Sequence, residues 1–172
     1  MTTRNPIPAE LQPSQLTAII DTREQTPLVL APLRTEVDTL AEGDYTLKGL
    51  ETVVVVERKS LPDLVQCCGA ERSRFVREVQ RLCSYPANML VVEATLEQIK
   101  AGGWRGNVTP ATVYGSLISW QSRGLGVWFA GDHEEAGRSV ARFLFTVARH
   151  RYHENRSLLA HALEAEPEAS NA

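Results

Sequence analysis

The sequence predicts an α/β domain in which a mixed β-sheet is flanked by helices. The first observation behind this prediction is that short apolar runs rich in β-branched residues alternate with longer segments of helical periodicity. The second is the length of 172 residues, which suits one domain with a sizeable core. The third is a composition that is ordinary for a globular protein, with 43% hydrophobic and 23% charged residues.

The first part of the chain is predicted to supply most of the strands. Residues 1–15 are polar and interrupted by prolines, so we expect a flexible N-terminal arm. The apolar run LTAIID predicts a buried strand, and the alternating run RTEVDTL predicts a half-buried one. The run YTLKGLETVVVVE predicts a hairpin that turns around Gly49. These strands cover residues 16–21, 34–40, 45–47 and 52–56.

The second part is predicted to be richer in helices. Ser60 can cap a short helix that has Pro62 in its first turn and that Gly69 interrupts. Apolar residues at helical spacing predict the next helix, and Trp120 and Trp128 are expected in the core. The predicted elements after the first helix are a helix at 71–84, a strand at 88–94, a helix at 109–123, a strand at 126–130 and a helix at 132–152.

The domain is therefore expected to span residues 16–152. Residues 153–172 would form a C-terminal extension that is largely a disordered acidic tail, because three glutamates and no base lie near its end. No apolar run approaches the ~18 residues of a membrane span. The start of the sequence lacks the apolar region of a signal peptide, so we expect a cytoplasmic protein, associated with the nucleoid if bacterial.

Cysteine content and net charge say little about which class of function the protein has. Three cysteines, two of them adjacent, make a poor disulfide framework and fit a reducing compartment. The net charge of −3 argues at first against a nucleic-acid partner. The segment ERSRFVREVQR nevertheless concentrates four arginines, so the net charge leaves the partner open.

Four carboxylates are expected to gather at one rim of the sheet. Asp44 starts one predicted hairpin strand and Glu57 follows the next, and antiparallel pairing would bring them together. Asp21 ends the first strand, and Glu24 follows it in the loop. Like charges this close repel one another, and a divalent cation removes the conflict. Oxygen ligands suit Mg²⁺ or Mn²⁺, so the sequence predicts a metal site formed by these four residues.

A cation follows the second of these carboxylates at strand spacing. Lys59 lies two positions after Glu57, and residues two apart in a strand face the same side. Its ammonium group could steady a nucleophilic water or neutralise charge on a phosphate. Arg58 points to the other side, or reaches a phosphate if the strand has already ended. With Asp44 these residues match what metal-assisted phosphodiester hydrolysis requires, although so short a pattern also occurs by chance.

The surrounding sequence is more specific. The segments IIDTREQTP, EGDY, VVVVERKSLPDLV, ERSRF, VQRL and MLVVEA follow one another within residues 19–94. This succession resembles the nuclease domain of the XPF family of structure-specific DNA endonucleases, which includes the archaeal Hef nuclease. The resemblance extends through GLGVWFAGD and SVARFLF and covers residues 16–150. The family motif, a Gly-Asp pair followed by Glu-Arg-Lys, three residues and Asp, stands here as Gly43, Asp44, Glu57, Arg58, Lys59 and Asp63.

The resemblance implies a restriction-endonuclease-like fold, a mixed sheet with helices on both sides. It implies a metal-dependent endonuclease that cuts branched or single-strand-containing DNA in repair or recombination. Mg²⁺ or Mn²⁺ would be held at Asp44 and Glu57, with Asp21 and Glu24 nearby. The catalytic residues would be Asp44, Glu57, Lys59 and Arg58, the last as a phosphate-binding or structural partner.

Further residues are candidates for supporting the site or binding DNA. Arg23 lies in the DTREQ segment, and Asp63 and Arg74 match further positions of the motif. Arg74, Arg77 and Arg81 form a cationic helix stripe, which is either a solvated face or a surface that follows phosphates. The supporting or DNA-binding candidates are Arg23, Asp63, Arg74, Arg77, Arg81 and Trp104.

Several of these candidates also have a purely structural interpretation. Trp104 lies beside Arg105 in a glycine-rich loop, where it could stack on a base or simply pack in the loop. Asp63 could only favour a helix N-terminus, and the carboxylates with Lys59 could form a surface ion-pair network.

The sequence also departs from the XPF family. It ends without the helix-hairpin-helix motifs that many members append. We therefore expect DNA affinity to come from the nuclease domain itself, from a homodimer or from a partner protein. Two other functions stay open: a catalytically inactive DNA-binding or dimerisation subunit, and a metal-dependent hydrolase of a non-nucleic substrate.

Overall fold

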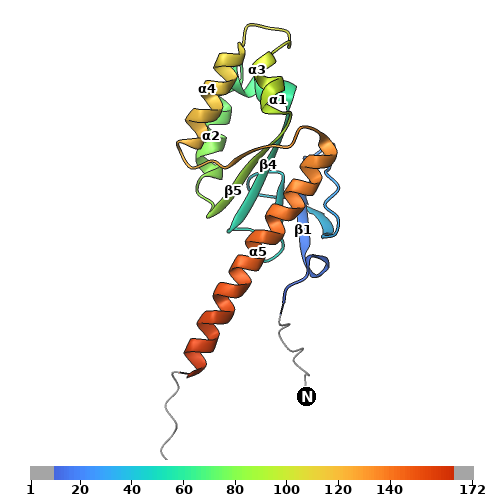
Figure 1. The fold of residues 1–172 in the computed structure, drawn as a ribbon, viewed down its shortest axis with the longest axis vertical. Coiled ribbons are helices and arrows are strands. Elements are labelled where there is room, and N and C mark those ends of the chain that lie inside the picture. Colours follow the sequence, from blue (N-terminus) through green and yellow to red (C-terminus); the bar gives the residue numbers. More distant parts are fainter. Residues whose placement is uncertain (1–9, 165–172) are drawn as a thin grey trace, which may run out of the picture.

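A six-stranded mixed sheet with helices on both faces forms the body of the protein (Figure 1). The computed structural model describes residues 10–164. The strands are β1 (Thr17–Asp21), β2 (Arg34–Asp38), β3 (Tyr45–Leu47), β4 (Val54–Ser60), β5 (Ala87–Glu93) and β6 (Val127–Phe129). The helices are the 3-10 turn η1 (Pro13–Gln15), α1 (Leu61–Cys68), α2 (Arg72–Leu82), α3 (Leu96–Ala101), α4 (Pro110–Gln121) and α5 (His133–Glu164). The predicted α/β class is confirmed.

The order of the strands places β3 and β4 at the centre of the sheet. The order is β2-β1-β3-β4-β5-β6. β3 pairs antiparallel with β1 and with β4, as the predicted hairpin requires. β4, β5 and β6 pair in parallel, and helices connect them. A strand covered on both faces is apolar on both faces, and this explains the unbroken valine run of β4.

Two hydrophobic cores cover the two faces of the sheet. On one face, Val54 and Val56 pack in a cluster with residues of α5 such as Leu144. On the other face, Val55 packs in a cluster with residues of α1, α2 and α4, among them Phe75 and Trp120. Figure 1 shows the same division, with α5 across one face and the other helices gathered on the opposite one. Successive residues of β4 therefore point into different cores.

Three details differ from the sequence predictions. All residues of β2 are exposed, whereas the alternation predicted a half-buried strand, because β2 lies at the edge of the sheet. Trp128 is 53% exposed and lies outside the core, while Trp120 is buried as predicted. The helix α3 was not predicted, since it is too short for a clear periodicity. It begins with a capping box in which Thr95 and Gln98 bond each other's backbone.

The ends of the chain also differ from the prediction. α5 continues to Glu164, so residues 153–164 are helical rather than part of a disordered tail, and Figure 1 shows this helix extending beyond the sheet. Its continuation is favoured by an ion pair of 3.2 Å between Arg151 and Glu154, one turn apart. The rest of the predicted tail, residues 165–172, lies outside the described residues, as do residues 1–9 of the predicted arm. No described helix is long and apolar enough to cross a membrane.

Candidate active site

The β3–β4 hairpin fixes Asp44 beside the middle of β4. Gly43 has a φ of 73°, and a Cβ added there would lie 2.4 Å from Val55 Cγ2 and 2.9 Å from the carbonyl oxygen of Val56. Only glycine fits such a position without strain. The amide of Asp44 donates a hydrogen bond of 2.8 Å to the Val56 carbonyl, which extends the strand pairing by one residue. The Gly-Asp pair therefore holds the carboxylate of Asp44 against β4.

β4 does not end where its charges begin. Glu57, Arg58 and Lys59 remain paired with β5, so the alternation of a strand applies to all three. Glu57 and Lys59 share one face, and their side chains form an ion pair. The Lys59 ammonium also lies 5.2 Å from the centre of the Phe75 ring on α2. The predicted placement of Lys59 beside Glu57 is confirmed.

The negative charges of two carboxyl groups on this face are only partly balanced by neighbouring cations. Glu57 is only 4% exposed, and burial raises its pKa well above the usual range, with a further contribution from the charge of Asp44. Burial likewise raises the pKa of Asp44 to about 6, against a hydrogen bond of 2.7 Å that its Oδ2 accepts from the Arg58 amide. A divalent cation would remove this conflict by binding both groups in their ionised form.

Lys59 is a permanent cation in this environment. Burial by itself would lower its pKa, but the carboxylates of Glu57, Glu78 and Asp44 outweigh burial and raise it to about 12. The lysine therefore stays protonated at neutral pH. It can compensate negative charge on a bound group, but it cannot accept a proton as a general base.

Arg58 occupies the opposite face, where it joins three segments of the chain. Its guanidinium donates to both carboxylate oxygens of Glu24, at 2.8 and 2.9 Å, and to Glu93 at 3.0 Å. Glu93, at the end of β5, also contacts His133 at the start of α5, at 2.7 Å. Although burial alone would raise it, the pKa of Glu24 is lowered by Arg58 and by the amide of Thr26.

Asp21 is bound within its own loop. It is 1% exposed, and its oxygens accept hydrogen bonds from the backbone and guanidinium of Arg23 and from the Leu40 amide. The Arg23 guanidinium is the main cause of its lowered pKa. The structure thus separates the four predicted carboxylates: Asp44 and Glu57 lack full compensation, whereas Asp21 and Glu24 each have an arginine partner. The metal-binding roles of all four stay predictions.

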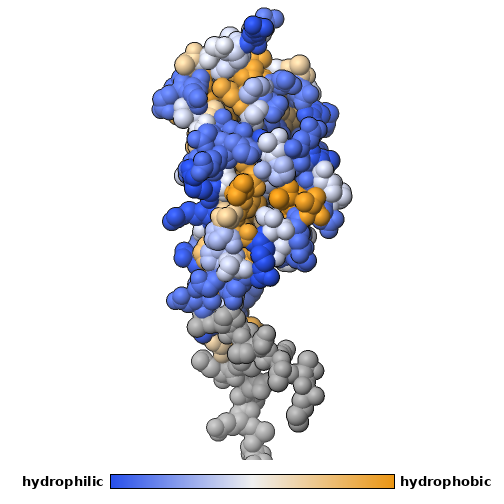
Figure 2. Space-filling view, turned by 90° about the vertical axis from the view of Figure 1, so that its right-hand side faces the viewer, coloured by the Kyte–Doolittle hydropathy of each residue, from blue (hydrophilic) through white to orange (hydrophobic). Residues whose placement is uncertain are grey.

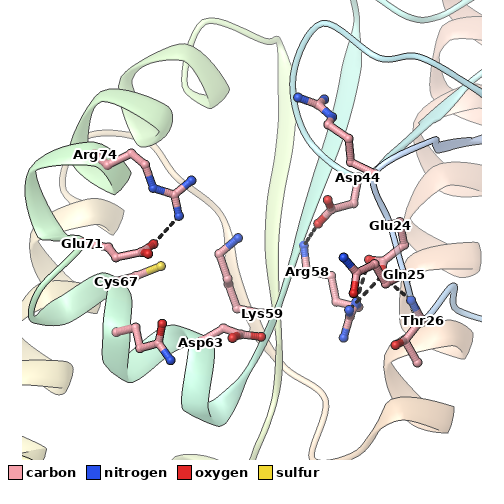
Figure 3. A pocket seen from close by; sticks show the side chains of 12 residues that line it. Glu24, Gln25, Thr26, Asp44, Arg58, Lys59, Asp63, Cys67, Glu71 and Arg74 are labelled. Carbon is pink, nitrogen blue, oxygen red and sulfur yellow. Dashed lines mark hydrogen bonds and ion pairs between the residues drawn. The ribbon is translucent and has the colours of Figure 1, made fainter.

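A cavity of about 450 Å³ opens over this part of the sheet (Figure 3). Figure 3 shows the Lys59 side chain projecting between the helices α1 and α2 on one side and the loop after β1 on the other. Asp63 lies at the rim and accepts a hydrogen bond of 2.6 Å from the Ser60 hydroxyl, so it also takes part in capping α1. The predicted residues that line this cavity are Arg23, Glu24, Asp44, Arg58, Lys59, Asp63 and Arg74.

The arginine stripe of α2 meets the cavity at one end only. Arg74 lines it and is paired with Glu71 and, at 3.9 Å, with Glu78. Arg77 and Arg81 do not line it; both are exposed, and Arg81 pairs with Glu42 at 2.5 Å. Trp104 does not line this cavity and is half-buried in its own loop. The DNA-binding roles of these residues stay predictions.

Sequence reasoning missed Glu78, Glu93 and His133. Glu78 lies 3.8 Å from the Lys59 ammonium and further raises the pKa of Glu57. Its position on α2 offered a signal, because this acid interrupts the apolar stripe of Phe75, Val79 and Leu82. Glu93 directly follows the apolar run of its strand, as Glu57 follows its valines, so the same signal could have found it. No local signal marks His133, whose contact joins distant segments.

The donors for a metal are few. Among residues 10–164, no three His, Cys, Asp or Glu side chains are grouped as a complete metal site. Asp44 and Glu57 are the two predicted carboxylates without an arginine partner, and Mg²⁺ often takes only one or two protein carboxylates and keeps several waters. The residues present therefore fit a Mg²⁺ or Mn²⁺ ion of this kind.

The fold and site together define a restriction-endonuclease-like α/β domain, with acidic and cationic side chains meeting at the end of its central strand β4. The ERCC4 domain model matches residues 20–143, and the chain belongs to this family of XPF-type nuclease domains. The proposed resemblance to the XPF family is confirmed.

Two solved structures illustrate the likeness. XPF from Aeropyrum pernix matches with a TM-score of 0.63 and 19% identity, over 88% of this chain and 74% of that one. The same organism's XPF in a complex with DNA matches with a TM-score of 0.59 and 18% identity, over 91% of this chain and 68% of that one. At these identities the likeness establishes the fold. No curated protein matches the chain significantly.

Proposed function

We propose that the protein is a metal-dependent DNA endonuclease that hydrolyses phosphodiester bonds in branched or single-strand-containing DNA, in repair or recombination. The observation that carries the proposal is the grouping of half-buried Asp44, buried Glu57 and the permanent cation Lys59, of which Asp44 and Lys59 line an open cavity. Membership of a family of DNA nucleases supports the same reaction class.

Each residue has a separate task in this proposal. Asp44 and Glu57 would hold Mg²⁺ or Mn²⁺, and the bound ion would supply Lewis acidity toward a water molecule and the phosphate. Lys59 compensates the negative charge that develops on the phosphate during in-line attack. Arg58 holds the loop after β1 and the end of β5 in place through Glu24 and Glu93. Arg74, at the mouth of the cavity, is suited to contact a DNA phosphate.

The test is a cleavage panel with Mg²⁺ and Mn²⁺. Flap, fork, Holliday-junction, single-stranded and plain duplex DNA are compared for the wild-type protein, Asp44→Ala and Lys59→Ala. We expect both variants to lose cleavage while their circular dichroism spectra stay unchanged. Undiminished cutting by Asp44→Ala would refute the proposed site.

The panel also separates the other candidate functions. Tight DNA binding by the wild type without any cleavage would favour an inactive DNA-binding or dimerisation subunit. DNA affinity that does not fall as salt rises would favour a hydrolase of a non-nucleic substrate, because phosphate contacts release counterions. Analytical ultracentrifugation of the wild-type protein with and without forked DNA tests whether a homodimer binds the DNA. If only a monomer is found and it binds weakly, a partner protein is expected to supply the DNA affinity.

A further inference from the structure

A second cavity, of about 430 Å³, adjoins the candidate active site. Leu61, Pro62 and Val65 of α1 form one side of it, and Trp104 and Arg105 belong to the other. Gln66 of α1 lines both cavities, so the two share a wall. Whatever occupies the second cavity is therefore close to whatever occupies the first.

The loop that carries Trp104 is held firmly against the helices. The indole N–H donates a hydrogen bond of 2.6 Å to the Val108 carbonyl. A Cβ added to Gly69, at the end of α1, would lie 2.6 Å from Val108 Cγ2, so the loop and the helix are in close contact. Gly102 has a φ of 71°, and a Cβ there would lie 2.8 Å from Pro110 Cγ at the start of α4. The Trp104 ring is thus positioned before any ligand binds, which lowers the entropy cost of binding.

The chemistry of this cavity combines an aromatic ring, an aliphatic wall and a cation. Arg105 is exposed and forms no hydrogen bond or ion pair with any residue in the described range 10–164. Figure 2 shows apolar surface bordered by hydrophilic surface near the upper end of the molecule, where Figure 1 places α1, α3 and the loop between α3 and α4. An apolar slot beside a free guanidinium suits a flat heterocycle that is attached to a phosphate.

We propose that this cavity binds an unpaired nucleobase of the DNA strand whose neighbouring phosphate lies in the candidate active site. The inference rests on the proposed function and names the substrate feature that the domain itself would recognise. A base within a duplex is stacked and paired, so its face is available only after unpairing. Trp104 stacks on the base, Arg105 contacts the adjacent phosphate, and Gln66 offers its amide at the shared wall. The preference for single-strand-containing DNA would then originate in the nuclease domain.

The test compares Trp104→Leu with Trp104→Phe in the full chain. Both variants lose the indole hydrogen bond to Val108, but only phenylalanine keeps an aromatic face. Forked DNA carries the fluorescent base 2-aminopurine at each unpaired position in turn, and binding is measured in EDTA so that no strand is cut. We expect wild type and Trp104→Phe to quench the probe at one or two adjacent positions. Trp104→Leu should lose the quenching and bind forked DNA about 5- to 150-fold more weakly, with duplex binding unchanged.

A second variant covers the case in which Trp104→Leu loosens the loop. Arg105→Ala removes an exposed side chain without described contacts, and it should reduce the slope of log affinity against log salt by about one. The matched control Arg123→Ala, another exposed loop arginine, should leave that slope unchanged. Equal behaviour of the two Trp104 variants, or an unchanged slope for Arg105→Ala, overturns the base site.

Failure of this inference is distinguishable from failure of the proposed function. If the wild type cuts forked DNA and Asp44→Ala does not, while quenching is independent of Trp104, the nuclease assignment stands and the base site is wrong. If quenching depends on Trp104 but Mg²⁺ supports no cleavage, the base site stands and the catalytic assignment is wrong.

Discussion

Replacing Arg58 is expected to damage the fold before it affects the chemistry. The Arg58 side chain is 15% exposed, and its partners Glu24 and Glu93 are 4% and 13% exposed. Arg58→Met would leave the largely buried Glu24 without its cation and Glu93 with only its contact to His133, and removing one partner of a buried pair costs about 3–5 kcal/mol. For a chain of 172 residues, this corresponds to a melting temperature lowered by about 6–20 °C.

The assay is urea unfolding at pH 7 in EDTA, for Arg58→Met, Glu24→Gln and the double variant. Because Glu24→Gln removes the charge that Arg58 compensates, the double variant should lose less stability than the two single losses added together. Arg138→Met is the matched control, since Arg138 also contacts two carboxylates, Glu134 and Glu135, but does so on the exposed surface of α5. We expect its unfolding to resemble that of the wild type.

One result would refute this reasoning. If Arg58→Met unfolds within about 1 kcal/mol of the wild type but loses cleavage, Arg58 does not act as a structural link between segments. Its guanidinium would then act on the substrate phosphate, which is the other role that the sequence left open.

Three further predictions concern the carboxylates. Burial raises the pKa of Asp44 to about 6 from its usual 3.8, so the folded protein holds this proton more tightly than the unfolded chain. The metal-free wild type should therefore lose up to about 3 kcal/mol of unfolding free energy relative to Asp44→Asn as the pH rises from about 4 through about 6; a difference that is flat with pH would contradict this. Added Mg²⁺ or Mn²⁺ should raise the melting temperature of the wild type more at pH 8 than at pH 5, because the ligands must be ionised, and Asp44→Asn should lose the effect; an equal increase in that variant would exclude Asp44 as a ligand. Glu78→Gln removes a charge that raises the pKa of Glu57, so the acidic limb of the cleavage pH profile should move to lower pH, and an unmoved limb would contradict the coupling.

The short-range features of the site could be predicted from the sequence. Two-residue periodicity placed Glu57 and Lys59 on one face, and this held because β4 stays paired with β5 through both residues. The hairpin turn likewise placed Asp44 beside β4. Both predictions depend only on chain-local geometry, which a strand and its turn largely fix.

The partners of the charges could not be predicted in the same way. Glu24 lines the cavity together with Asp44, but its ion pair with Arg58 was not expected. The ion-pair partner of Glu24 depends on the conformation of the loop after β1, and tertiary packing determines that conformation. The partner of Asp21 could not be predicted for a different reason. Arg23 is only two residues away, but whether the Asp21 carboxylate binds this arginine or a metal depends on how deeply it is buried, which the sequence does not show.

The apolar run of β4 and the charges that follow it are parts of one arrangement. Val54, Val55 and Val56 are at most 1% exposed, and burying each such side chain contributes about 1.5–3 kcal/mol. The same burial, continued along the strand, shields Glu57 from water and partly shields Asp44, and it raises the pKa of both. A strand that ended at the surface after Val56 would lose this coupling, because solvated carboxylates would neither repel each other strongly nor attract a divalent cation as firmly.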